Sequence, residues 1–158
     1  SYMTTKVAIG DIDGDGKNEI VLAEGDALCY GRQSGGQMAW FKPDGEVTAM
    51  WTEHRIAEGL RDAHSLQLED LCGNGRLDIF VAEIGQPGAD ADHYASPVPQ
   101  VMLYENNGDG SFTRHVLDKE TGTHESVMAD MTGNGKLDIV GKPLWGPWRW
   151  NQIVWYQE

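Results

Sequence analysis

The feature that most constrains this chain is an acidic, glycine-rich stretch that occurs three times. Its leading aspartates, Asp11, Asp70 and Asp130, stand 59 and 60 residues apart. The three copies are VAIGDIDGDGKNEIVLAE (7–24), LQLEDLCGNGRLDIFVAE (66–83) and SVMADMTGNGKLDIVGKP (126–143). Flanking segments also correspond: TEHRI (52–56) with TRHVL (113–117), and QMAWFK (37–42) with QVMLYE (100–105) and QIVWYQ (152–157). This agreement in order and spacing indicates an internal repeat of about 60 residues.

Each repeat has the local pattern of β-strands. Its apolar runs are short, rich in Val, Ile, Leu, Tyr and Trp, and bounded by Gly, Asn, Asp or Pro. KPDGEV (42–47) and ENNGDGSF (105–112) are predicted as hairpin turns between the third and fourth strands. The predicted strands are 5–10, 64–69 and 124–129 (first), 20–24, 78–83 and 138–142 (second), 37–42, 100–105 and 152–157 (third), and 51–56 and 112–117 (fourth).

A four-stranded antiparallel meander repeated at this spacing predicts an all-β fold of β-propeller blades. A β-sandwich is the alternative, although sandwiches do not usually show this internal periodicity. We expect one partial propeller domain over 1–158, with blades at about 5–60, 61–121 and 122–158, or about 2.75 blades, because the last lacks its fourth strand. We therefore expect the C-terminal part of a longer propeller. Self-association through open blade edges is the alternative way to cover the exposed faces.

Composition narrows the function classes. The 158 residues are 40% apolar and include six tryptophans, which argues against disorder despite a net charge of −13. This charge disfavours nucleic acids and anionic membranes as partners and suits a protein that binds cations. No apolar run is long enough to span a membrane. Cys29 lies near the end of an apolar run and is expected to be buried, and we expect no disulfide between it and Cys72.

The first acidic loop has the donor chemistry of a calcium site. Ca²⁺ takes oxygen ligands from carboxylates and backbone carbonyls, and glycines let a short loop curl so that alternate side chains converge. The expected ligands are Asp11, Asp13, Asp15 and Glu19 at positions 1, 3, 5 and 9, with the Lys17 carbonyl at position 7. An EF-hand needs a glutamate at position 12, where this chain has Leu22 in a predicted strand, so that interpretation fails.

The other two loops carry fewer carboxylates. Position 3 is Cys72 in the second loop and Thr132 in the third. Their candidate ligands are Asp70, Asn74, the Arg76 carbonyl and Asp78, then Asp130, Asn134, the Lys136 carbonyl and Asp138. Because ligand charge helps to set calcium affinity, we expect loop one to bind tightest and loop two weakest. The alternative is that both are simply glycine-rich turns. Calcium here is expected to be structural rather than catalytic.

Residues with titratable or aromatic side chains lie at the end of the predicted blades opposite the acidic loops. The long loop 83–100 and the segment 143–150 supply candidate ligand-binding residues: Asp90, Asp92, His93, Tyr94, Trp145, Trp148, Arg149 and Trp150. His64 and His124 occupy matching positions where a first strand begins, near the mouth of the central channel. Each of these sets also has a packing interpretation. His54 and His115, on outer strands, are expected to be surface or packing residues.

The three loops resemble FG-GAP/VCBS repeats, the calcium-loop blades of integrin α-subunit propellers and of many secreted bacterial proteins. The resemblance rests on the pattern D-x-D-x-D-G-x-x-[DE] followed by an aliphatic strand, together with the aromatic third strand, and it covers essentially the whole chain. It implies a β-propeller, bound Ca²⁺ and an extracellular or periplasmic location.

Two function classes stay open at this point. The first is a calcium-stabilised binding or scaffold module whose ligand is a glycan or a protein. The second is the propeller part of a sugar- or polysaccharide-acting enzyme of lyase or dehydratase type, with His64, His124, His93, Asp90 and Asp92 as metal ligands or acid/base groups. An architectural repeat without a small ligand is a third interpretation. No nucleophile elbow, HExxH, P-loop or dinucleotide fingerprint occurs in the sequence, which favours the binding module.

Overall fold

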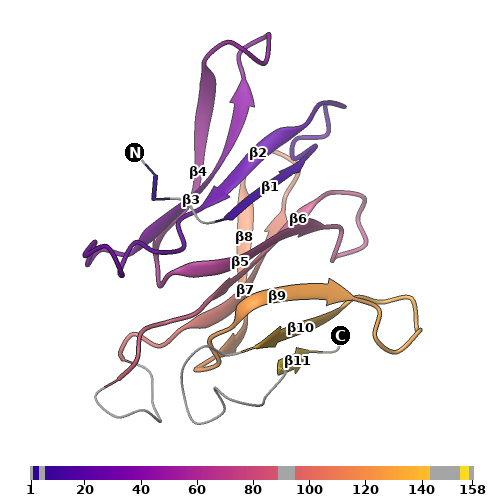
Figure 1. The fold of residues 1–158 in the computed structure, drawn as a ribbon. Helices are drawn as coiled ribbons and strands as arrows, with labels where there is room; N and C mark the ends of the chain where they lie inside the picture. Colours follow the sequence, from indigo (N-terminus) through magenta and orange to yellow (C-terminus); the bar gives the residue numbers. More distant parts are fainter. Residues whose placement is uncertain (1, 4–5, 89–94, 143–153, 157–158) are drawn as a thin grey trace.

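Three antiparallel sheets make up the part of the chain that the computed structural model describes, residues 2–3, 6–88, 95–142 and 154–156 (Figure 1). The first sheet contains β1 (Lys6–Gly10), β2 (Glu19–Ala23), β3 (Gly36–Pro43) and β4 (Trp51–Leu60) in sequence order. The second contains β5 (Ala63–Glu69), β6 (Asp78–Glu83), β7 (Gln100–Asn106) and β8 (Phe112–Lys119). The third contains β9 (His124–Ala129), β10 (Asp138–Lys142) and β11 (Val154–Tyr156).

This architecture confirms the all-β class and matches partial propeller blades, since each sheet is a meander in which consecutive strands pair. The fourth strands β4 and β8 extend to Leu60 and Lys119, beyond the predicted ends. Of the predicted strand 152–157, β11 covers Val154–Tyr156 and the remaining residues lie outside the described ones. Within the described ranges there is no helix of the length and hydropathy needed to cross a lipid bilayer.

The core lies between the sheets, because the middle sheet is covered on both faces. Alternation along β6 sends Ile79 and Val81 into a cluster shared with the first sheet, which includes Met38 and Trp40. Phe80 and Ala82, on the other face of the same strand, pack with residues of the third sheet such as Ile139. Every residue of β6 is buried, which explains why four apolar residues follow one another between Asp78 and Glu83.

Polar side chains also join neighbouring sheets at their first strands. The Gln67 amide on β5 accepts a hydrogen bond from the Met128 N–H (3.1 Å) and donates one to the Ser126 carbonyl (2.8 Å) on β9. The Ser65 hydroxyl accepts a further bond from the Ser126 N–H at 2.8 Å. Side chains of β5 thus form the hydrogen bonds of backbone groups on β9. These bonds set the register between β5 and β9, which are the first, or inner, strands of neighbouring sheets.

The outer faces of the first and third sheets expose apolar side chains. Val7 and Ile9 on β1 are 60% and 64% exposed, and Val127 on β9 is 53% exposed. A blade buries its apolar face against a neighbouring blade, so these residues mark faces of the kind that a further blade covers.

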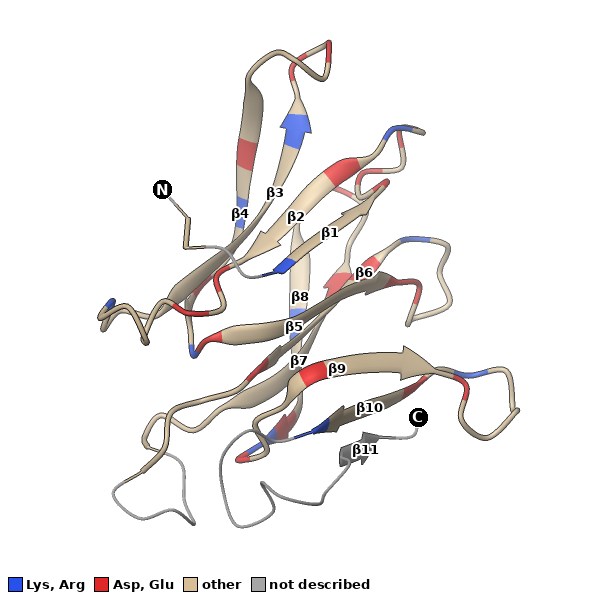
Figure 2. Ribbon diagram, in the orientation of Figure 1, with Lys and Arg blue, Asp and Glu red and all other residues tan. Residues whose placement is uncertain are grey.

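The meander separates two ends of the molecule. The turns that follow β1, β5 and β9 lie on the right in Figure 1, and the starts of the same strands lie on the left. Figure 2 shows Asp or Glu together with a Lys or Arg in each of these three turns. The acidic loops therefore share one end, and the starts of the first strands share the other.

The expectation that Cys29 is buried was wrong. Cys29 lies in a turn between β2 and β3 and is exposed. The apolar run ends at Ala23 with β2, and the buried apolar residue of the following turn is Ala27. Cys29 and Cys72 do not form a disulfide.

Asn106 at the end of β7 holds the first two sheets together at the acidic end. Its side-chain NH₂ donates to the Ile12 carbonyl (2.7 Å) in loop one and to the Leu77 carbonyl (3.1 Å) in loop two. Its backbone N–H donates to Asp78 Oδ1 at 2.9 Å, and its side-chain oxygen accepts from the Gly108 N–H at 2.9 Å. The side chain is buried and makes a connected set of hydrogen bonds.

We predict that Asn106→Ala lowers the free energy of unfolding by about 2 kcal/mol or more, because two buried carbonyls lose their donors. Chemical denaturation followed by tryptophan fluorescence measures this change. Asn107→Ala alters the neighbouring, exposed residue and is the matched control. Its side-chain hydrogen bonds to Ser111 and Thr113 are open to solvent, so we expect a smaller change, of about 0.5 kcal/mol. Equal effects of the two substitutions would contradict the role of Asn106.

Candidate metal centre

The Asp11 carboxylate organises the first acidic loop. Its Oδ1 accepts hydrogen bonds from the Gly14 N–H (2.8 Å) and the Asp15 N–H (3.1 Å), and its Oδ2 accepts one from the Gly16 N–H (2.9 Å). Gly14 and Gly16 have φ angles of 75° and 85°, a region that favours glycine. The backbone therefore curls around the carboxylate at position 1.

This curl brings three carboxylates together. Asp11, Asp13 and Asp15 each offer an oxygen, and these three atoms lie within 4.8 Å of one another. The Lys42 ammonium, at the end of β3, contacts Asp13 Oδ2 and lies 2.7 Å from Asp15 Oδ2. Its hydrogen bond lowers the pKa of Asp15, and the hydrogen bonds to Asp13 and Asp15 raise the pKa of Lys42. A cationic side chain thus offsets part of the repulsion among the carboxylates.

Glu19, the predicted ligand at position 9, is buried at the start of β2 and is not one of the three clustered carboxylates. Its Oε2 accepts a hydrogen bond from the Ile12 N–H at 2.9 Å. Its Oε1 is buried with no hydrogen-bond partner among the described residues. Burial raises the pKa of Glu19, and the negative charge of Asp13 acts in the same direction.

The unpartnered Oε1 of Glu19 bears on whether the first loop suits a cation. A buried carboxylate oxygen without a donor is costly, and a hard cation satisfies it. The donor set at this loop consists entirely of oxygen atoms, which is the chemistry that Ca²⁺ selects. Asp11, Asp13 and Asp15 fit such an ion, whose effect would be to neutralise the clustered charge, and Glu19 stays a predicted ligand.

The second and third loops repeat the backbone pattern of the first. Asp70 and Asp130 accept backbone N–H groups of their own loops, as Asp11 does. The position-5 side chain accepts the N–H of position 7 in all three loops: Asp15 from Lys17 (2.9 Å), Asn74 from Arg76 (3.0 Å) and Asn134 from Lys136 (2.8 Å). The backbone carbonyls of Lys17, Arg76 and Lys136 stay predicted ligands.

The two weaker loops differ at position 9. Asp78 is fully satisfied: its Oδ2 accepts from the Leu71 and Cys72 N–H groups, and its Oδ1 accepts from the Asn106 N–H. Asp138 Oδ2 accepts from the Met131 N–H at 2.9 Å, but its Oδ1 is buried with no partner among the described residues. Among the described residues, Glu19 Oε1 and Asp138 Oδ1 thus have no donor, whereas both oxygens of Asp78 accept hydrogen bonds.

At the opposite end, the structure brings His64 and His124 together. Their ring centroids lie 4.9 Å apart with an interplanar angle of 33°. Burial lowers the pKa of His124, and the nearby His64 lowers it further. The other predicted residues of this end lie outside the described ones: Asp90, Asp92, His93, Tyr94, Trp145, Trp148, Arg149 and Trp150.

The outer-strand histidines lie as expected. His54 on β4 stacks on Trp40, with ring centroids 3.9 Å apart, and this contact covers the edge of the core. The exposed His115 on β8 pairs with Glu105 through its Nε2, at 2.8 Å. Neither residue belongs to a candidate site.

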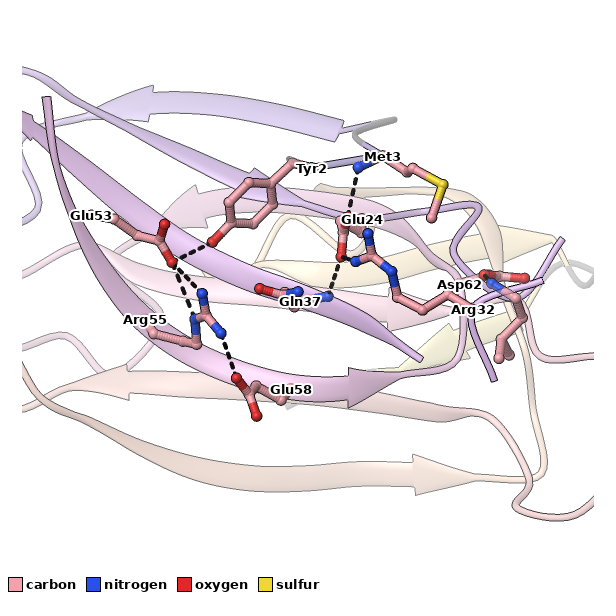
Figure 3. A network of polar contacts seen from close by, with 10 residues as sticks. Tyr2, Met3, Glu24, Arg32, Gln37, Glu53, Arg55, Glu58 and Asp62 are labelled. Carbon is pink, nitrogen blue, oxygen red and sulfur yellow. Dashed lines mark hydrogen bonds and ion pairs between the residues drawn. The ribbon is translucent and has the colours of Figure 1, made fainter. Parts of the chain in front are cut away.

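Sequence reasoning missed Lys42 and a pair of repeated buried glutamates. Glu24, drawn in Figure 3, accepts the Met3 N–H (2.6 Å) and the Gln37 N–H (2.9 Å), and it pairs with Arg32. Glu83 accepts the Arg61 N–H (2.7 Å) and the Gln100 N–H (2.9 Å) in the same way. The repeat alignment already places these two glutamates at matching positions, so it could have identified them.

We predict that Lys42→Met lowers the melting temperature in chelator and increases the stabilisation that added Ca²⁺ produces. The substitution removes the ammonium that offsets the negative charge of Asp13 and Asp15. The metal ion then has no side-chain cation to compete with for these two carboxylates. Thermal unfolding with and without Ca²⁺ measures both effects. Lys119→Met, an exposed lysine at the end of β8, is the control and should change neither quantity. A smaller calcium response in Lys42→Met would contradict this role.

A family model described as FG-GAP-like repeat matches residues 11–81. The match begins at the first residue of loop one and ends within β6, so it includes the first two acidic loops. No curated protein matched the chain significantly. The sequence resemblance, the repeated turns and the blade-like sheets agree with this match, which shows that residues 11–81 are similar to the FG-GAP-like repeat.

Proposed function

We propose that this chain is a calcium-binding β-propeller module that binds a glycan or a protein in the extracellular or periplasmic space. The observation that carries the proposal is the set of carboxylates in loop one. One oxygen from each of Asp11, Asp13 and Asp15 lies within 4.8 Å of the other two, and Glu19, at the end of the same loop, has a buried Oε1 without a described partner. The role of calcium is structural: it ties β1 to β2 and thereby holds the first blade in its meander.

An extracellular setting suits loops two and three as well. Weak calcium sites fill where the ion is abundant, as it is outside the cytoplasm. The net charge of −13 favours cation binding and disfavours nucleic acid or an anionic membrane as partner.

Two hollows that reach the end opposite the acidic loops support ligand binding there. One, of about 340 Å³, lies between the first two sheets, and its lining includes Leu60, Tyr104 and Arg114. A second, of about 300 Å³, is lined by residues that include Gln33 and Gln86. Arg61 and Pro97 line both hollows. This mixture of apolar surface with a guanidinium and amides suits the hydroxyls of a sugar or the backbone of a peptide.

The exposed apolar faces support a larger assembly. Val7 and Ile9 on one outer face, and Val127 on the other, offer surface on which further blades or a second copy of the chain would pack. Both arrangements bury the same side chains.

We predict that saturating Ca²⁺ raises the melting temperature by about 5–10 °C relative to chelator, as expected for an ion at about 100 times its dissociation constant. Glu19→Gln should lose most of this shift, because the amide supplies a weaker ligand. Since burial raises the pKa of Glu19, its ionised form reduces the stability of the metal-free protein as the pH rises through that pKa. The variant should therefore melt in chelator at or above the wild-type temperature at neutral pH.

Glu46→Gln is the matched control, because Glu46 is an exposed glutamate in the turn between β3 and β4. It should keep the full calcium shift. A wild-type melting temperature that does not respond to Ca²⁺ would refute the calcium proposal.

For the ligand end, we predict that Arg61→Gln weakens binding to the best glycan on an array, or to the best captured protein, by about tenfold, as expected for the loss of one charged hydrogen bond. The calcium shift should stay unchanged, because Arg61 lies at the other end. Arg55→Gln removes the same charge from the outer strand β4 and should leave binding unchanged. Equal loss in both variants would show that net charge, rather than the hollow, accounts for binding.

A further inference from the structure

A second cluster of ligating side chains lies at the starts of the inner strands, away from the acidic loops. His64, at the start of β5, and His124 and Glu125, at the start of β9, each offer one ligand atom, and these atoms lie within 4.8 Å of one another. Two imidazoles and a carboxylate form a donor set different from the all-oxygen set of the loops. Such mixed nitrogen and oxygen donors suit Zn²⁺ and related transition metals.

Irregularities in two neighbouring sheets create this cluster. On β5, Ala63 pairs with Glu83 and Ser65 pairs with Ala82, so His64 is an extra residue with no partner on β6. In a regular strand, His64 and Leu66 would point to the same face of the sheet. The extra residue interrupts this alternation of side chains. A β-bulge of this kind redirects a side chain and is frequent beside functional sites.

A matching irregularity occurs on β9. His124 pairs with Lys142 and Val127 pairs with Val140, so Glu125 and Ser126 together lie opposite Gly141. A Cβ atom at Gly141 would lie 2.5 Å from the Ser126 hydroxyl and 3.0 Å from the Thr123 side chain, so a larger residue there would displace these side chains. Glu125 has a φ of 60°, which is uncommon for a residue other than glycine. The backbone thus adopts a costly conformation where it places His124 beside Glu125.

The hydrogen bonding of His64 suits a metal ligand. Its Nε2 lies 3.0 Å from Asp26 Oδ1, and its Nδ1 is buried with no hydrogen-bond partner among the described residues. When Nε2–H donates to the Asp26 carboxylate, Nδ1 carries the free lone pair. This carboxylate–histidine arrangement holds ligating imidazoles in many metal sites, where it orients the ring and raises its basicity.

Glu125 already pairs with a cation. Lys6, at the start of β1, places its Nζ 2.5 Å from Glu125 Oε1. Side chains from all three inner strands therefore meet at this end: Lys6 from β1, His64 from β5, and His124 and Glu125 from β9. A metal ion and the Lys6 ammonium would compete for the same carboxylate.

We propose that His64, His124 and Glu125 bind a divalent transition-metal ion of the Zn²⁺ class, with Asp26 orienting His64. The site goes beyond the proposed calcium module, from which it differs in donors and position. Three protein ligands leave a coordination position open for water or for an oxygen of a bound molecule. The metal would thus lie at the end where the hollows beside Arg61 are found.

The test is titration of the intact, untagged chain with Zn²⁺, followed by calorimetry, and with Co²⁺, followed by visible absorption. Saturating Ca²⁺ keeps the acidic loops occupied, and a Cys29→Ser, Cys72→Ser background removes the two thiols. We expect one Zn²⁺ ion per chain, and Co²⁺ bands that indicate nitrogen and oxygen ligands.

His124→Asn and Glu125→Gln should each weaken Zn²⁺ binding by about 100-fold, the upper range for loss of a group that supports a metal site. Asp26→Asn should weaken it by about tenfold. Lys6→Met should strengthen binding, because the competing ammonium is gone. His115→Asn, at an exposed histidine of the outer strand, is the matched control and should bind as the wild type does.

Circular dichroism and melting temperature establish that each variant is folded. If His124→Asn does not fold, Glu125→Gln tests the site instead, because the Glu125 side chain is exposed. Absence of Zn²⁺ binding to the wild type would overturn the proposal. Equal binding by wild type, Glu125→Gln and Lys6→Met would also overturn it, as would a loss in His115→Asn equal to that in His124→Asn. These outcomes are independent of the calcium shift in melting temperature, so the two proposals fail separately.

Discussion

A buried carboxylate at the start of the second strand holds each repeat in shape, and the rest of the structure depends on it. Glu19, Asp78 and Asp138 are buried, and each accepts the N–H of the second residue of its own loop. Because a buried carboxylate is costly unless donors or cations surround it, each loop must complete this environment. In loop two, Asn106 supplies the missing donor. In loops one and three, one carboxylate oxygen has no donor among the described residues.

The stacking of sheets separates this structural chemistry from the other end of the molecule. A meander returns the chain after every strand, so all acidic turns lie at one end and all starts of the inner strands at the other (Figure 1). The acidic end contains the clustered carboxylates and the tight glycine turns, together with Lys42 and Cys72. The opposite end contains the bulges, the histidines and the hollows beside Arg61. This division keeps the proposed calcium sites apart from the surface proposed for ligand binding.

The strands were predictable because their signals are local. Short apolar runs bounded by glycine and aspartate identified the strands of each sheet, and the repeat added evidence from equivalent positions. The prediction for Cys29 was wrong because neighbouring apolar residues do not show which side chains of a turn face the core. Lys42 was missed because it reaches Asp13 from 29 residues away, across a strand pairing that the sequence does not display.

The sequence by itself determined the repeat, the order of the strands and the type of atom that each loop offers, because these follow from residue identity and spacing along the chain. Only the tertiary structure decided which carboxylate oxygens have donors, since Asn106 completes the environment of Asp78 while no described group does the same for Glu19 Oε1. It also decided that His64 and His124 meet, 60 residues apart and on different sheets. Such convergence depends on sheet packing and on two bulges, and neither leaves a local pattern in the sequence.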